Sequence, residues 1–198
     1  MRELPVMESF LTIQGEGRYS GSPAFFIRVG GCDVGCHWCD VKESWDANAH
    51  PMVPVEELAK QAKGQASMVV VTGGEPLQYD MGPLTRLLRS AGLKTHLETS
   101  GAFTLTGSWD WICVSPKKFK NPLPDVLAHA DELKVIIYNK ADFDWALEQA
   151  RHVPKACRLF IQPEWSVASK MHLKMVEFVK ENIQWSISLQ IHKYLEIP

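Results

Sequence analysis

The sequence predicts an α/β protein built on an incomplete, open parallel (β/α) barrel with a reduced set of helices. Apolar, β-branched runs typical of buried strands alternate with helical segments, and this order favours a parallel sheet with right-handed crossovers. The chain has 198 residues, whereas a complete eightfold barrel needs about 250. We therefore expect one domain over residues 1–198, with roughly six or seven strands and fewer helices.

The predicted elements follow one another without an internal repeat. Residues 68–72 (MVVVT) form the clearest strand, and the helix predicted at 55–63 ends at Gly64. The segment between the strands predicted at 94–98 and 111–115 is too short for a full helix. The other strands are predicted at 24–29, 133–138, 159–162 and within 185–191, and the other helices at 83–90, 141–151 and 168–182.

Composition and charge are those of a compact globular protein. Hydrophobic residues make up 45% of the chain, charged residues make up 22%, and the net charge is -2, which leaves no basic footprint for nucleic acid. Apolar runs are too short to span a membrane, and the N-terminal residues MRELPVMESF lack the regions of a signal peptide. We expect a cytoplasmic protein without nucleic-acid or membrane partners.

Three cysteines form a C-x3-C-x2-C motif, at Cys32, Cys36 and Cys39. Three thiolates on one loop can hold three irons of a cubane 4Fe-4S cluster and leave the fourth iron open to a cofactor or substrate. Structural zinc normally takes four ligands and electron-carrying clusters take four cysteines, so neither pattern fits well. Cys113 and Cys157 lie in distant apolar runs and are expected in the core.

A second motif, the sequence GGEP at residues 73–76, follows the strand predicted at 68–72. Glycine lets the backbone approach a ligand closely, and a nearby carboxylate can pair with an ammonium group. Together with the cysteine loop, this motif resembles the radical S-adenosylmethionine (SAM) superfamily, in which the open iron binds the amino and carboxylate groups of SAM. Trp38 occupies the aromatic position that precedes the third cysteine in that superfamily. The resemblance implies a barrel of the radical SAM type.

The match becomes more specific outside these two motifs. It includes TIQGEG at residues 12–17 and FIR at 26–28, and it continues through 98–101, 115–117, Gln162 and Pro198. Over nearly the whole chain, the sequence resembles the 7-carboxy-7-deazaguanine synthase family. This resemblance implies ring-contracting conversion of 6-carboxy-5,6,7,8-tetrahydropterin to 7-carboxy-7-deazaguanine with release of ammonia, in 7-deazapurine (queuosine) biosynthesis. It also implies a homodimer and an electron donor such as flavodoxin or ferredoxin.

The family resemblance assigns roles to individual residues. Cys32, Cys36 and Cys39 would hold the cluster, which with SAM carries the chemistry, so no side chain is assigned as catalytic. The residues assigned to SAM are Trp38, Cys39, Asp40, Gly74, Glu75, Ser115, Pro116 and Lys117, with Glu98 a further candidate for the ribose hydroxyls. The residues assigned to the pterin are Ile13, Gln14, Gly15, Glu16, Arg28, Thr72, Gln162 and Pro198.

Two of the pterin assignments have a clear chemical reason. The planar guanidinium of Arg28 suits the substrate carboxylate. The terminal carboxylate of Pro198 would accept hydrogen bonds from the amino-pyrimidine edge. His37, inside the cysteine loop, is expected to face solvent rather than to replace a ligand.

Val41 departs from the family pattern, which commonly has a threonine or serine hydroxyl at this position as a Mg²⁺ ligand. Valine offers no lone pair to a hard cation, so Mg²⁺ either relies on substrate oxygens and water or is not needed. Two alternative functions remain open. The residues at 14–17 and Arg28 argue against a glycyl-radical activating enzyme, and residues 73–76 argue against an iron-sulfur electron carrier without SAM chemistry.

Overall fold

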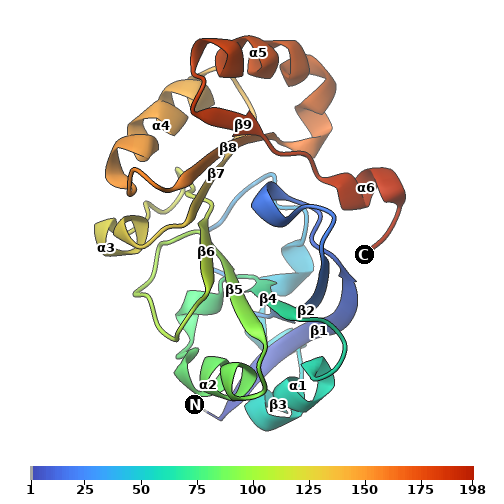
Figure 1. The fold of residues 1–198 in the computed structure, drawn as a ribbon. Coiled ribbons are helices and arrows are strands. Elements are labelled where there is room, and N and C mark those ends of the chain that lie inside the picture. The colour runs from blue at the N-terminus through green and yellow to red at the C-terminus, as the bar shows by residue number, and fades with distance from the viewer. Residues whose placement is uncertain (1) are drawn as a thin grey trace.

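Over residues 2–198, the computed structural model forms one nine-stranded sheet in the order β3-β1-β2-β4-β5-β6-β7-β8-β9 (Figure 1). The strands from β2 to β9 in this order run parallel, whereas β1 is antiparallel to both β2 and β3. The strands are β1 (Glu3–Ile13), β2 (Pro23–Val29), β3 (Met52–Pro54), β4 (Met68–Gly73), β5 (Lys94–Thr99), β6 (Trp111–Val114), β7 (Glu132–Ile137), β8 (Arg158–Pro163) and β9 (Trp185–Ile187). The predicted open α/β barrel is confirmed.

The helices are α1 (Val55–Ala62), α2 (Gly82–Ser90), α3 (Pro124–Ala128), α4 (Ala141–Gln149), α5 (Ala168–Glu181) and α6 (Ile191–Leu195). Helices α1 to α5 lie along the outer face of this sheet, whereas α6 lies apart from them beside the end of the β1–β2 hairpin (Figure 1). Single 3₁₀ turns are η1 (Gly17–Tyr19), η2 (Lys42–Ser44), η3 (Ala47–Ala49), η4 (Pro76–Gln78), η5 (Ala150–His152) and η6 (Trp165–Val167). Residues 100–110 contain no helix, as predicted. No helix within residues 2–198 has the length and apolar character that a membrane crossing requires.

The sequence-based expectation missed two strands and two short helices. Strand β1 carries Pro5 and the charged residues Glu3 and Glu8, so it lacks a continuous apolar run, and its pairing is antiparallel. Strand β3 has three residues, and α3 and α6 have five residues each. Segments of three to five residues are too short for a strand or helix periodicity to appear in the sequence.

The core lies mainly between the sheet and its helices. Residues 68–71 of strand β4 are all apolar, because Val69 and Val71 face the helices while Val70 faces the barrel interior, in a separate apolar group with Ala24. Cys113 and Cys157 are both buried, as predicted.

The open side of the barrel is closed by two segments that are far apart in the sequence. The end of the β1–β2 hairpin meets the chain that follows β9, where Ile191 N donates to Gly15 O at 2.9 Å and Gly17 N donates to Ser188 Oγ at 2.8 Å. Figure 1 shows the blue hairpin end beside the red C-terminal segment. A Cβ on residue 15 would lie 2.0 Å from Nδ1 of His192, so this contact requires Gly15.

Candidate active site

A cavity of about 480 Å³ opens at the carboxyl ends of the parallel strands. This is the edge at which barrels of this kind carry their functional loops. The sequence-assigned residues that line it are Ile13, Gln14, Gly15, Glu16, Arg28, Cys32, Cys36, Trp38, Cys39, Asp40, Thr72, Gly74, Glu75, Glu98, Ser115, Lys117, Gln162 and Pro198. Pro116 is the exception, because it is buried and does not line the cavity.

The cysteine loop directs three thiols to this cavity. Its conformation is fixed by hydrogen bonds from Cys39 N to Cys36 O at 3.0 Å and from Cys32 N to Trp45 O at 3.1 Å. Burial raises the pKa of Cys36 to about 11; Lys117 opposes the shift and the other two thiols add to it. A thiol held in this way needs a strong positive charge to become a thiolate, and iron supplies one.

The donor set therefore fits a 4Fe-4S cluster on Cys32, Cys36 and Cys39. These cysteines are not arranged to hold a single metal ion, and neither is any other group of three histidine, cysteine or carboxylate side chains within residues 2–198. His37 is exposed on this loop, as predicted, and its ring contacts those of Phe119 and Tyr138 edge-on.

The GGEP motif fixes the loop against the sheet. Gly74 N donates to Val29 O at 2.9 Å and Glu75 N donates to Gly31 O at 2.8 Å, and a Cβ on Gly74 would lie 2.2 Å from Gly31 O. The Glu75 carboxylate already accepts four hydrogen bonds, from Leu77 N, Thr99 Oγ1, Ser100 N and Ser100 Oγ. Any bond from Glu75 to a ligand ammonium would be additional to these four.

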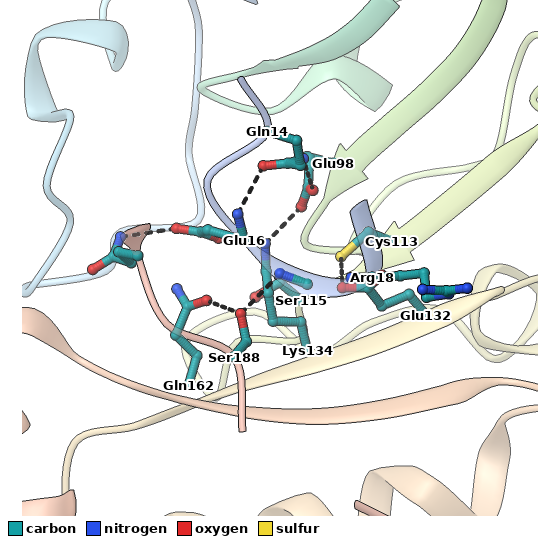
Figure 2. Close-up of polar contacts among 12 residues, drawn as sticks. Gln14, Glu16, Arg18, Glu98, Cys113, Ser115, Glu132, Lys134, Gln162 and Ser188 are labelled. Atoms are coloured by element: carbon teal, nitrogen blue, oxygen red, sulfur yellow. Dashed lines mark hydrogen bonds and ion pairs between the residues drawn. The ribbon is translucent and has the colours of Figure 1, made fainter. Parts of the chain in front are cut away.

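A buried lysine lies in the floor of the cavity (Figure 2). Lys134 Nζ donates to Glu16 Oε2 at 2.5 Å and to Glu98 Oε2 at 2.9 Å. Burial alone would raise the pKa of Glu16, but the charge of Lys134 and its hydrogen bond lower that pKa to about 2. Burial likewise opposes the charged form of Lys134, but the surrounding carboxylates hold its pKa well above the ordinary value.

A third carboxylate, Glu132, lies behind this floor and outside the cavity. It accepts hydrogen bonds from Arg18 N and Trp111 Nε1, both at 3.1 Å, and from the Cys113 thiol at 3.7 Å. Burial, followed by the negative charge of Glu98, raises the pKa of Glu132 to about 7, although Lys134 opposes the shift. Glu132 therefore titrates in the neutral pH range.

The opposite wall is formed by β1, β2 and β4. Glu8, Arg28 and Thr72 lie side by side across these strands, and Arg28 Nε donates to Glu8 Oε1 at 2.6 Å. Within residues 2–198, the two terminal nitrogens of Arg28 make no hydrogen bond. The stacked rings of Phe10 and Phe26, 5.7 Å apart between centroids, provide an apolar surface beside them.

The C-terminal segment forms a further wall. Thr12 Oγ1 donates to Pro198 O at 3.1 Å, and Lys193 Nζ donates to Asp40 Oδ2 at 2.8 Å. Gln190 Nε2 donates to Glu16 Oε1 at 2.9 Å. The segment thus contacts both the loop that carries the pterin assignments and the loop that carries the cysteines.

Several cavity residues have no sequence-based assignment, and they include Phe10, Phe26, Trp165, Lys134, Gln190, His192 and Lys193. Lys134 had a usable signal, because Glu132 and Lys134 are charged residues two apart in an apolar strand and therefore share one face. Gln190 lies near the end of the range 185–191 in which the last strand is predicted, and His192 and Lys193 follow that range. This segment has no motif, so only the fold reveals their position.

The raised pKa of Glu132 predicts a stability effect. The unfolded chain loses this proton near pH 4.5 and the folded chain near pH 7, so the contribution of Glu132 to the free energy of unfolding should decrease as pH rises between these values. The contribution is about 3 kcal/mol. Glu132→Gln should remove this decrease in urea unfolding of the reduced, metal-free protein, whereas Glu177→Gln, at an exposed ion pair, should retain it. The same slope in all three proteins would contradict the assignment.

Comparisons with known proteins agree with this geometry. Residues 26–156 match the family model of the radical SAM superfamily. The 7-carboxy-7-deazaguanine synthase of Flavobacterium psychrophilum is 55% identical over 98% of this chain and 93% of its own length. The enzyme of that name from Synechocystis sp. is 48% identical over the same shares.

Similarity to a solved structure extends to the fold. The crystal structure of QueE from Escherichia coli superposes with a TM-score of 0.83 at 30% identity and covers 95% of this chain and 94% of its own. The radical SAM superfamily uses a 4Fe-4S cluster and SAM. The chain belongs to the 7-carboxy-7-deazaguanine synthase family within the radical SAM superfamily.

Proposed function

We propose that the protein converts 6-carboxy-5,6,7,8-tetrahydropterin to 7-carboxy-7-deazaguanine with loss of ammonia, in 7-deazapurine (queuosine) biosynthesis. The observation that carries the proposal is the convergence of three residue sets on one cavity: the cysteine thiols, the residues assigned to SAM other than Pro116, and the residues assigned to the pterin. Relatives that share up to 55% of the sequence bear the corresponding name.

Cys32, Cys36 and Cys39 would hold the 4Fe-4S cluster. With SAM bound, a reduced cluster of this kind supplies a 5′-deoxyadenosyl radical able to abstract hydrogen from the substrate. The chain's own contribution is to bind, to orient and to exclude water. The Lys117 ammonium lies 5.7 Å from the centroid of the Trp38 ring, which precedes the third cysteine of the loop.

SAM would lie against the cysteine loop and the ends of β4 to β6. Gly74 allows its methionine end to approach the backbone closely. Lys117 Nζ already donates to Ser115 O and Ser115 Oγ, both at 2.6 Å, so Ser115 and Lys117 would present a fixed polar pair to SAM.

The pterin would lie between the β1–β2–β4 wall and the C-terminal segment. Arg28 would bind its carboxylate, since Glu8 occupies only Nε and the two terminal nitrogens remain available. Gln162 Oε1 accepts from Ser188 Oγ at 2.8 Å, which fixes the side-chain amide and directs its N–H groups toward other acceptors. The terminal carboxylate of Pro198 would accept hydrogen bonds from the amino-pyrimidine edge.

The remaining parts of the proposal concern Mg²⁺, reductant and assembly. Val41 lines the cavity, and the nearby hydroxyl of Ser44 is buried and donates to Val41 O at 2.7 Å, so it does not replace the hydroxyl ligand. Any Mg²⁺ would therefore be held by substrate oxygens and water. A flavodoxin or ferredoxin would supply the electron, and the protein would act as a homodimer.

Anaerobic turnover tests the proposed function directly. The reconstituted protein, incubated with SAM, a reductant and the carboxypterin, should form 7-carboxy-7-deazaguanine detectable by mass spectrometry, and omission of Mg²⁺ should lower the rate only modestly. Cleavage of SAM without any change in the pterin would contradict the substrate assignment. Formation of a glycyl radical on an added glycyl-radical enzyme would instead support the alternative function of a glycyl-radical activating enzyme.

The cysteine assignment predicts contrasting effects of two substitutions. Cys36→Ala should abolish SAM cleavage and leave an unstable or absent cluster, because a cubane with two protein ligands loses a third of its anchoring thiolates. Cys157→Ala, which changes a buried thiol outside the cavity, should keep full iron content. Iron and sulfide analysis together with electron paramagnetic resonance distinguishes the two, and turnover by the Cys36 variant would exclude Cys36 as a ligand.

The assignment of Arg28 predicts a defect specific to the pterin. Arg28→Ala should lower kcat/KM for the pterin by about 30-fold or more, equivalent to roughly 2 kcal/mol lost with a charge-assisted pair. SAM cleavage without substrate should persist. Arg89→Ala, which breaks an ion pair with Asp110 outside the cavity, is the matched control. If both variants retain native kcat/KM, another group binds the carboxylate.

The position of Pro198 predicts sensitivity to the chain end. A tag fused after Pro198 removes the terminal carboxylate and should raise KM for the pterin markedly, while cluster content and uncoupled SAM cleavage stay unchanged. A tag at the N-terminus should have little effect. Identical steady-state kinetics for the two tagged proteins would remove the terminus from the site.

A further inference from the structure

The cavity floor contains a closed circuit of hydrogen bonds that links two parts of the site. Lys134 donates to Glu16 and to Glu98, Gln14 Nε2 donates to Glu98 Oε1 at 3.2 Å, and Glu16 N donates to Gln14 Oε1 at 3.1 Å. Three elements meet here: the hairpin end, β5 and β7. Lys134 is the only one of the four circuit members with a positive charge, and its side chain is 5% exposed.

We propose that Lys134 is a positioning residue that fixes Glu16 and Glu98 in one arrangement, so that the pterin-binding loop and the SAM-binding end of β5 depend on the same ammonium group. The inference rests on the proposed function for the identity of the two ligands. It does not require Lys134 to contact either of them. The circuit itself belongs to residues of the chain and is open to measurement without turnover.

The charges around Lys134 explain why a cation is needed there. Glu16, Glu98 and Glu132 approach it from the hairpin, from β5 and from its own strand. The Cys113 thiol from β6, Lys117 and His192 also face this group. Without Lys134, the two circuit carboxylates would share a buried site with no compensating positive charge in the circuit, and like charges in such a site favour uptake of a proton.

The two ends of the circuit give the inference its specific consequence. A residue that only contacts the pterin would affect pterin binding, whereas loss of Lys134 should disturb Glu16 and Glu98 together. The structure therefore predicts higher KM values for both SAM and the pterin in the same variant. It also predicts a new acid limb in the pH profile, because Glu16 must be ionised to accept hydrogen bonds from the ring.

The test compares Lys134→Met with Lys118→Met in the full-length protein. Lys118 is a matched control, since it donates to Asp142 at 2.7 Å and to a backbone carbonyl but lies outside the cavity. Lys134→Met should raise both KM values at least tenfold, and kcat/KM should fall as pH decreases through the raised pKa of Glu16. The Lys118 variant should keep native KM values and a native pH profile. Native KM values for either ligand in a folded Lys134→Met protein would overturn the inference.

A second measurement uses the metal-free protein and needs no activity. Carbon-13 NMR of glutamate carboxylates should show Glu16 titrating with a pKa of about 2 in the native protein and with a clearly higher pKa in Lys134→Met. An unchanged Glu16 titration in Lys134→Met would overturn the inference. Because this titration involves no turnover, failure of the native protein to form product would reject the proposed function without affecting this result.

The conservative variant decides the case if Lys134→Met does not fold. Lys134→Arg keeps the positive charge but places a larger planar group in a buried space. It should therefore retain the low pKa of Glu16 while raising KM for both ligands several-fold. Native KM values for both ligands in Lys134→Arg, or a raised KM for the pterin alone, would contradict a positioning role.

Discussion

The site depends on the closure of an open barrel without further strands. The parallel sheet ends at β9, and the gap between β9 and the β1–β2 hairpin is filled by residues 188–198. The bond from Ile191 N to Gly15 O and the bond from Gly17 N to Ser188 Oγ hold these segments together. Because the hairpin end carries Gln14, Gly15 and Glu16, the closure that completes the barrel also completes the cavity.

Charge inside the barrel is organised around the same closure. Lys134 on β7 pairs with Glu16 from the hairpin and with Glu98 from β5, and Gln190 from the C-terminal segment donates to the other oxygen of Glu16. A buried carboxylate is costly unless it is paired and hydrogen-bonded. Glu16 satisfies this condition only when the hairpin, the sheet and the C-terminal segment are all in place. Glu75 satisfies it differently, through neutral hydroxyl and backbone donors.

The sequence allowed much of this arrangement to be predicted. Parallel strands such as 68–72 are recognisable because both faces are buried, and the cysteine and GGEP motifs follow such strands directly. Strand β1 was missed because its polar residues and Pro5 interrupt the apolar pattern. The roles of Gln190, His192 and Lys193 depend on contacts with residues about 150 or more positions away in the chain, such as Gln190 with Asp40. No local pattern encodes such contacts. The sequence predicts that the Glu75 carboxylate can pair with an ammonium group, but periodicity does not reveal the strand-end donors that also surround it.

The central claim is that one cavity receives both SAM and the pterin. A crystal structure of the reconstituted protein with both molecules tests it most directly. SAM should lie against the cysteine loop and Gly74, and the pterin should lie between Arg28 and Pro198, with Lys134 still bridging Glu16 and Glu98. A pterin bound outside this cavity, or a C-terminal segment detached from the hairpin in the ternary complex, would contradict the account.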